Sequence, residues 1–282
     1  MAILITGSTG RLGSALIDLL STTTHPLLAA TRRSRPPPSL ATHPTVHLDW
    51  HDESTWITPF SPPHPPITSV FLLAVPGTTP QVRNFATLCA SQGVKRIVFM
   101  AGASAVKGQG MWAHLDQLRE EYGITYSLVS PCWLNENLLA ERYVAEIKQG
   151  FIKSGLGTGE APWSAARDVA AVSLWALTVE GEGPENTIVA GWERLSGVEI
   201  AETFTRVLGR RVQHYHLSLQ ENVEYLKGLG YPPGSAQLVA QIEAYSAAGK
   251  LEQVPYEDIE EKIGRPMVKF EDWVEEHKVT WL

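Results

Sequence analysis

Three glycines near the start of the chain have the spacing of a nucleotide-binding turn. Gly7, Gly10 and Gly13 lie in the stretch TGSTGRLG, between the first apolar run and the first segment of helical period. A turn without side chains lets the backbone approach a pyrophosphate, whose charge is then met by free amide groups and the helix dipole. Such glycines also serve tight strand-to-helix turns for steric reasons, but their placement here favours dinucleotide binding. The predicted pyrophosphate site is Gly7, Ser8, Thr9, Gly10, Arg11, Leu12 and Gly13.

Two arginines follow the second apolar run, in the stretch LAATRRSR. Many dinucleotide-binding proteins carry an acid at this point, which binds the ribose 2′-hydroxyl of NAD, whereas an arginine can pair with the 2′-phosphate of NADP. Arg32 and Arg33 therefore predict NADP as the cofactor. The alternative interpretation is that both arginines only keep an exposed strand end soluble.

The ends of the later strands supply the rest of the predicted cofactor site. Asp49, in the stretch HLDW, is placed to meet the adenine amino group. Ala74, Val75 and Pro76 follow the fourth strand, where they would line the path to the nicotinamide, and Pro131 follows the sixth. Ligands of open α/β sheets bind along this carboxyl edge of the strands.

Apolar runs and helical segments alternate through the first half of the chain, which is typical of βαβ units and a parallel sheet. Strands are expected at residues 2–6, 26–31, 45–49, 69–75, 95–102, 125–130 and 186–191, and helices at 10–20 and 80–94. The glycine-rich stretch 150–163 is expected to form a loop. The predicted fold class is α/β, a Rossmann-type doubly wound parallel sheet with a smaller, mainly helical C-terminal lobe.

The same pattern suggests how the chain divides into domains. Residues 1–150 are predicted to form an NADP-binding Rossmann domain, completed by a returning strand and helix from about residues 165–192. Residues 193–282 are more polar and mostly helical, and they are predicted to form a smaller substrate lobe.

Composition narrows the possible partners and setting. The formal net charge of -7, with no basic cluster longer than TRRSR, argues against nucleic-acid binding. No run of eighteen apolar residues occurs, so we expect neither export nor membrane insertion. Cys89 and Cys132 are the two cysteines, which makes a reducing cytoplasm the expected location. The histidines and cysteines lack metal-ligand spacing, so no metal site is predicted, and the oligomeric state is left open.

The chain resembles the NmrA-like group of atypical short-chain dehydrogenases, and within it the ergot-alkaloid festuclavine and agroclavine dehydrogenases. The matching stretches occur in family order over nearly the whole chain: TGSTGRLG, LDWHDESTWITPF, SQGVKRIVFMAGAS, AHLDQL, SPCWLNENL, ARDVA and TRVLGRRV. The resemblance implies a Rossmann fold, NADP binding and small-molecule reduction in fungal-type specialised metabolism. Many members carry Arg-Pro where this chain has Ser130 and Pro131, so contacts made by that arginine are absent here.

The sequence lacks the tyrosine–lysine pair with which many ketone reductases protonate an alkoxide. None of the eight tyrosines is followed four residues later by a lysine. An imine or iminium needs orientation more than a strong acid, because its carbon already accepts hydride. His114 and Asp116 are the predicted catalytic residues, since His114 could transfer a proton and Asp116 could hold a cationic amine. The alternatives are a half-buried histidine bonded to backbone and an exposed helix carboxylate.

Aromatic and amide side chains suggest where a substrate would bind. Trp112, Trp133 and Trp163 could stack on a flat indole or polycyclic alkaloid, and could attract a cation through their ring faces. Indole rings are also frequent core fillers. Asn135 and Asn137, which follow the sixth strand, complete the predicted substrate site.

Three functions are consistent with these residues. The favoured one is an NADPH-dependent reductase of a carbon–nitrogen double bond in an indole-alkaloid-like molecule. The second is a redox-neutral cyclase of the Pictet–Spengler type that retains NADP. The third is a non-catalytic regulator that senses NADP, against which the aromatic residues argue.

Overall fold

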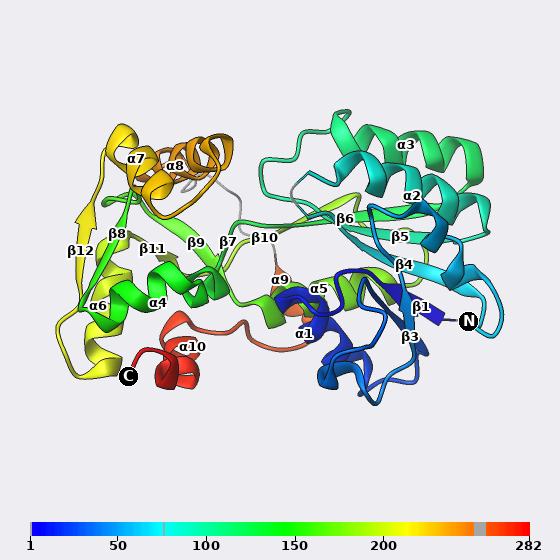
Figure 1. Ribbon diagram of the computed structural model, residues 1–282, viewed down its shortest axis with the longest axis horizontal. Coiled ribbons are helices and arrows are strands. Elements are labelled where there is room, and N and C mark those ends of the chain that lie inside the picture. The colour runs from blue at the N-terminus through cyan, green and yellow to red at the C-terminus, as the bar shows by residue number, and fades with distance from the viewer. Residues whose placement is uncertain (1, 76, 251–257) are drawn as a thin grey trace. The chain divides into compact units, whose positions relative to one another are not determined.

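The computed structural model describes residues 2–75, 77–250 and 258–282, and its largest element is a seven-stranded parallel sheet (Figure 1). The strand order is β10-β6-β5-β4-β1-β2-β3. These strands are β1 (Ala2–Ile5), β2 (Leu27–Thr31), β3 (Thr45–His47), β4 (Ile67–Leu73), β5 (Arg96–Met100), β6 (Thr125–Pro131) and β10 (Asn186–Val189). All seven strands expected from the sequence are present, which confirms the predicted α/β fold class.

Helices cover both faces of this sheet. One pair is α1 (Arg11–Leu20) and α5 (Ala166–Thr178), which contact each other, and α5 also contacts α9 (Ile259–Ile263). The other pair, α2 (Thr79–Ser91) and α3 (Gly110–Tyr122), lies on the opposite face (Figure 1). Among the described residues, no helix combines the length and apolar character needed to pass through a bilayer.

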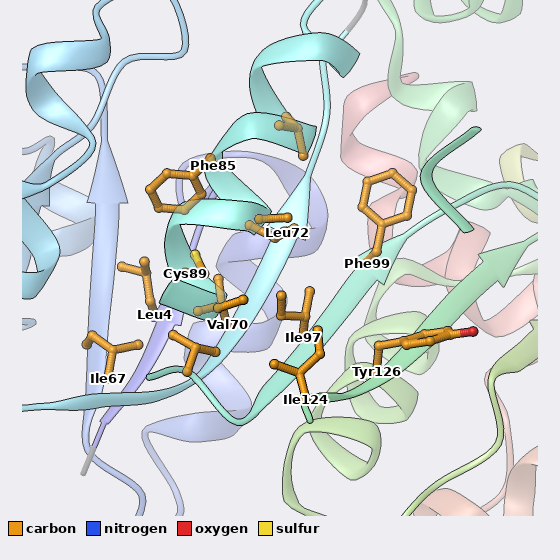
Figure 2. Packing of buried hydrophobic residues seen from close by; sticks show 14 of the residues in the cluster. Leu4, Ile67, Val70, Leu72, Phe85, Cys89, Ile97, Phe99, Ile124 and Tyr126 are labelled. Atoms are coloured by element: carbon orange, nitrogen blue, oxygen red, sulfur yellow. The ribbon is translucent and has the colours of Figure 1, made fainter. Parts of the chain in front are cut away.

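The core beneath α2 follows from the alternation of side chains along the strands. Val70 and Leu72, two residues apart on β4, point to the same face as Leu4 of β1. Figure 2 shows Phe85 and Cys89 of α2 packed over these strand residues. All five side chains are buried, and burial raises the pKa of the Cys89 thiol. Cys89 therefore acts as a small apolar core residue.

The rest of the chain forms a second compact unit with two small sheets. The strands β7 (Trp133–Leu134), β9 (Ala161–Ser164) and β11 (Arg194–Leu195) form one sheet, and β8 (Phe151–Ser154) and β12 (Gln213–His216) the other. Its helices are α4 (Glu141–Lys148), α6 (Gly197–Leu208), α7 (Leu219–Gly228), α8 (Pro233–Ala247) and α10 (Phe270–His277). The expectation of a loop at 150–163 was wrong, because this glycine-rich stretch contributes β8 and β9.

The division between the two units differs from the boundary expected near residue 150. The first unit comprises the described residues up to Pro131 together with Ala166–Val189 and Ile259–Arg265. Residues 132–150 belong to the second unit, because Tyr143 and Ile147 are buried in its core with side chains of α6 and α10. The segment that contains α9, expected in the C-terminal lobe, belongs to the first unit.

A buried carboxylate joins four segments of the second unit. Glu243 of α8 is fully buried and accepts hydrogen bonds from the Gly155 amide at 2.6 Å and the Asn222 side-chain amide at 2.7 Å. It also accepts a bond from Arg142, whose side chain is 7% exposed, at 3.2 Å. The hydroxyl of Tyr143 donates to the same carboxylate at 3.4 Å. The charge of Arg142 is thus balanced within the protein interior.

We predict that Glu243→Gln destabilises the protein by about 3–5 kcal/mol, because it leaves the buried Arg142 charge unpaired. The matched control is Glu224→Gln on α7, where an exposed carboxylate pairs with Lys227 at 2.8 Å, and we expect a loss below about 0.5 kcal/mol. Urea unfolding of both variants measures the difference. Equal loss of stability in the two variants would contradict a structural role for the buried pair.

Candidate active site

The glycine turn lies where the order of the strands reverses. Strand β1 lies inside the sheet, and the chain proceeds to β2 and β3 on one side of it and to β4, β5 and β6 on the other. Ligands of open parallel sheets bind at such a switch point, outside the carboxyl ends of the strands. The stretch predicted to bind a pyrophosphate therefore occupies the position at which this fold binds dinucleotides.

Hydrogen bonds from the turn hold it to both neighbouring strands. The Thr6 hydroxyl donates to the Phe71 carbonyl of β4 at 3.0 Å and accepts from the Leu73 amide at 2.9 Å. On the other side, the Ser8 hydroxyl donates to the Ala30 carbonyl of β2 at 2.6 Å. The turn is thus attached to the strands on both sides of β1.

Two of its glycines are required by the local geometry. Gly7 has a φ of 64°, a conformation that favours glycine. A Cβ on Gly13 would lie 2.2 Å from the Gly7 carbonyl oxygen, so only glycine lets α1 start this close to the turn. Among the described residues, no side chain caps α1 at Gly10. The amide groups of the first turn of α1, which includes Arg11 and Leu12, and the exposed Thr9 and Gly10 fit an anionic group.

The residues predicted to bind the adenosine half follow β2 and β3. Arg32 and Arg33 are both exposed, and the described residues supply neither with an ion-pair partner. Asp49 is half-buried and accepts a hydrogen bond from the His51 amide at 3.0 Å, so part of its carboxylate already orders its own loop. The two arginines are free to meet an anion, and the role of Asp49 stays a prediction.

The residues predicted near the nicotinamide follow β4 and β6. Ala74 is half-buried and Val75 is 45% exposed, whereas Pro76 lies outside the described residues. Pro131 is buried, and its carbonyl accepts a hydrogen bond from the Ala103 amide at 3.2 Å. That bond ties the end of β6 to the segment after β5. Their cofactor contacts stay predictions.

A cavity of about 580 Å³ opens on the same edge, where β5 ends and the chain leads into α3. Apolar side chains form most of its wall, chiefly Phe99, Met100, Val106, Met111, Trp112 and Leu128. Polar atoms come from Thr79, Ser104 and Gln109. The volume suits a small organic ligand. Of the described residues that line it, none has an ionisable side chain.

His114 lies on the side of α3 that faces α2. Its Nε2 is 3.0 Å from the Thr87 hydroxyl and 3.0 Å from the Arg83 carbonyl oxygen. Burial lowers the pKa of His114, so the ring is mainly neutral at pH 7. His114 is not one of the described residues that line the cavity. This environment matches the alternative of a half-buried histidine bonded to backbone.

Asp116 faces β6 and is already engaged by two side chains. Its Oδ1 accepts hydrogen bonds from the Tyr126 hydroxyl at 2.5 Å and from Arg119 at 2.9 Å. His114 and Asp116 therefore point to different neighbours, as residues two apart on a helix must. A catalytic role for either stays a prediction, and the structure gives both of them other partners.

The predicted aromatic site is distributed over both units. Trp112 lines the cavity of the first unit. Trp133 and Trp163 belong to the second unit, where their rings stack with centroids 5.5 Å apart. Nearby, Asn135 is buried and its side-chain oxygen has no hydrogen-bond partner among the described residues, while Asn137 is half-buried. Their substrate contacts stay predictions.

Sequence reasoning missed most of the cavity wall. Met100 and Ser104 were not among the candidates, and neither were Gln109 and Met111. These residues lie between the end of a buried strand and the first turn of a helix. That position could have identified them, because ligands of parallel sheets bind at the carboxyl ends of the strands. Tyr126 was also missed, because a tyrosine at the start of a strand reads as an ordinary core residue.

Comparison with known proteins agrees with this geometry. Residues 3–125 match the NAD dependent epimerase/dehydratase family. The chain is 30% identical to festuclavine synthase I of Penicillium roqueforti, with all of both chains covered. It is 29% identical to the agroclavine dehydrogenase of Claviceps fusiformis, with 100% of this chain and 99% of the relative covered.

Solved structures of low sequence identity share the fold. The Citrobacter sp. triphenylmethane reductase complexed with NADP(H) superposes with a TM-score of 0.80 at 19% identity, covering 98% of this chain and 99% of that one. An NADPH-dependent quinone oxidoreductase of Escherichia coli gives 0.78 at 23% identity with the same coverage. On its full-length similarity to the festuclavine and agroclavine enzymes, the chain belongs to the NmrA-like group of atypical short-chain dehydrogenases, a family of NAD(P)-dependent oxidoreductases.

Proposed function

We propose that the protein is an NADPH-dependent reductase of a carbon–nitrogen double bond in an indole-alkaloid-like small molecule. The observation that carries this proposal is the cavity at the end of β5, which lies on the cofactor edge of the sheet and has no ionisable side chain among its described lining residues. Reduction of an iminium needs no proton from a side chain, whereas reduction of a ketone does. The similar enzymes are named for the alkaloids festuclavine and agroclavine, which supports an alkaloid-like substrate for this protein.

The residues present fit a bound NADPH. The uncapped start of α1 and the glycine turn suit a pyrophosphate, and Arg32 and Arg33 suit a 2′-phosphate. When bound, the cofactor supplies a hydride, which would turn a cationic carbon–nitrogen double bond into a neutral amine. The apolar wall of the cavity would orient the flat part of the substrate and exclude water from it.

The contacts of His114 and Asp116 support cyclisation less well than they support reduction. A Pictet–Spengler-type reaction needs a base to remove a proton and restore the aromatic ring. Among the predicted groups, His114 bonds to α2 and Asp116 bonds to Tyr126 and Arg119. We therefore favour reduction, and the isotope experiment described below distinguishes the two reactions.

The paired arginines predict a preference for NADPH over NADH. Changing both Arg32 and Arg33 to alanine should weaken NADPH binding by about 100-fold or more while changing NADH binding little, because each of the two charge-assisted phosphate contacts contributes about 1.5–3 kcal/mol. Arg35→Ala, an exposed arginine in the same loop, is the matched control. Calorimetric titration measures both cofactors. Equal affinities of the unaltered protein for NADPH and NADH would refute the assignment.

The glycine turn predicts that Gly10→Val abolishes NADPH binding without unfolding the protein. Gly10 has an extended backbone that valine adopts, and its Cβ would lie 3.2 Å from the Gly7 carbonyl oxygen, which requires a shift of only a few tenths of an ångström. The added methyl groups would then act by filling the space of the phosphates. Gly234→Val, at an open position on α8, is the control. Circular dichroism reports the fold, and calorimetry reports binding. A folded Gly10→Val variant with normal NADPH affinity would place the cofactor elsewhere.

Replacing His114 distinguishes between the two types of reaction. With the open-chain iminium formed from tryptamine and an aldehyde as substrate, which can be either reduced or cyclised, His114→Ala should lower turnover by less than about threefold, because an iminium is already activated for hydride transfer. A cyclase that used this ring as its base would lose about a hundredfold or more. Deuterium from deuterated NADPH should appear in the product, as measured by mass spectrometry. Product without deuterium, formed with unchanged NADPH absorbance, would favour cyclisation.

A further inference from the structure

The indole of Trp112 lines the cavity but has its polar atom turned away from it. The Nε1–H group donates to the Tyr126 hydroxyl at 3.1 Å. Trp112 is 9% exposed and Tyr126 is 4% exposed, so water competes little for this bond. Because the only polar atom of the indole is engaged, the ring presents apolar atoms to a ligand in the cavity.

Trp112, Tyr126 and Asp116 form a chain of hydrogen bonds in which each residue donates to the next. The Tyr126 hydroxyl donates to Asp116 Oδ1 at 2.5 Å, and a carboxylate can only accept. The phenol oxygen is thus left to accept from the indole of Trp112. Burial and the bond to Asp116 raise the pKa of Tyr126, so the phenol keeps its proton. Moving the Tyr126 hydroxyl would break both bonds, and rotating the Trp112 indole would break the bond to Tyr126.

Asp116 is in turn held by a chain of ion pairs. One nitrogen of Arg119 donates to Asp116 at 2.9 Å and the other to Glu185 at 2.8 Å. Glu185 also pairs with Lys107 at 2.6 Å, on the segment between β5 and α3 that lines the cavity. Two carboxylates alternate with two cations, which leaves the network without net charge.

The spacing of these residues on α3 explains why they meet. Trp112, Asp116 and Arg119 are four and then three residues apart, so they share one face of the helix. Tyr126, at the start of β6, lies opposite this face, and the Arg119 guanidinium is 5.0 Å from its ring centroid. Figure 2 shows the Tyr126 hydroxyl pointing away from the labelled core side chains. Tyr126 thus links the apolar core to the polar network.

We infer that Tyr126 is a positioning residue, which holds the indole of Trp112 as a fixed apolar wall for a flat, uncharged ring of the substrate. The inference rests on the proposed function for the identity of that substrate, but the ring contact can be measured by binding alone. Binding against a wall that is already ordered avoids the entropy cost of ordering a mobile side chain. Asp116 acts in this arrangement through Tyr126, without touching the ligand.

The test uses indole as a neutral probe, titrated by ligand-observed NMR in the presence of saturating NADPH. Tyr126→Phe and Trp112→Phe should each weaken indole binding by about fivefold, which corresponds to the loss of one neutral hydrogen bond. The double variant should bind no more weakly than either single variant, since both changes act on the same ring. Tyr122→Phe, at the end of α3, is the matched control and should bind normally.

A direct readout follows the indole N–H of Trp112 by two-dimensional NMR, with its signal assigned by its disappearance in Trp112→Phe. This proton should exchange with water faster in Tyr126→Phe and in Asp116→Leu. Asp116→Asn keeps an acceptor for the phenol, so it should restore slow exchange and normal indole binding. The affinity for NADPH should stay within about twofold in all these variants.

Three results would overturn the inference: normal indole binding by Tyr126→Phe, additive effects in the double variant, or equal losses of NADPH and indole affinity. The last would indicate a general structural role for Tyr126. A protein that meets the binding and exchange expectations but shows no hydride transfer would refute the proposed function and leave this inference standing.

Discussion

The predicted cofactor site at the carboxyl ends of the strands depends on how closely α1 packs against the turn after β1. A Cβ at Gly13 would lie 2.2 Å from the Gly7 carbonyl oxygen, so helix and turn can be this close only without a side chain. The hydroxyls of Thr6 and Ser8 then anchor the turn to β4 and β2. With the backbone held in this way, free amide groups at the start of α1 face the edge where the strand order reverses.

The charged side chains next to the cavity pair with one another. Asp116, Arg119, Glu185 and Lys107 form a chain of ion pairs, and none of the four is among the described residues that line the cavity. The described lining of the cavity is apolar with a few neutral polar groups. The described lining can orient a flat molecule but offers no side-chain acid, and this property is the basis on which we propose the reduction of an electrophile that is already activated.

The second unit shows where patterns in the sequence are too weak to predict structure. Its strands have two to four residues, and β8 and β9 lie in a stretch that contains four glycines, so local preference indicated a loop. Pairing with β12 and with β7 and β11 decides their conformation. The partners of Glu243 come from three separate segments, and no spacing along the chain indicates that these segments meet.

The sequence by itself determined the seven-stranded parallel sheet, the glycine turn and the position of the two arginines. These features depend on local periodicity and on residues near each other in the chain, which a linear pattern records. Only the tertiary structure decided the neighbours of His114 and Asp116, because helix direction places one against α2 and the other against β6. It alone also joined Trp112 to Tyr126, and stacked Trp133 on Trp163 within the second unit. Contacts between side chains distant in sequence depend on how helices pack on the sheet, and that packing has no local signature.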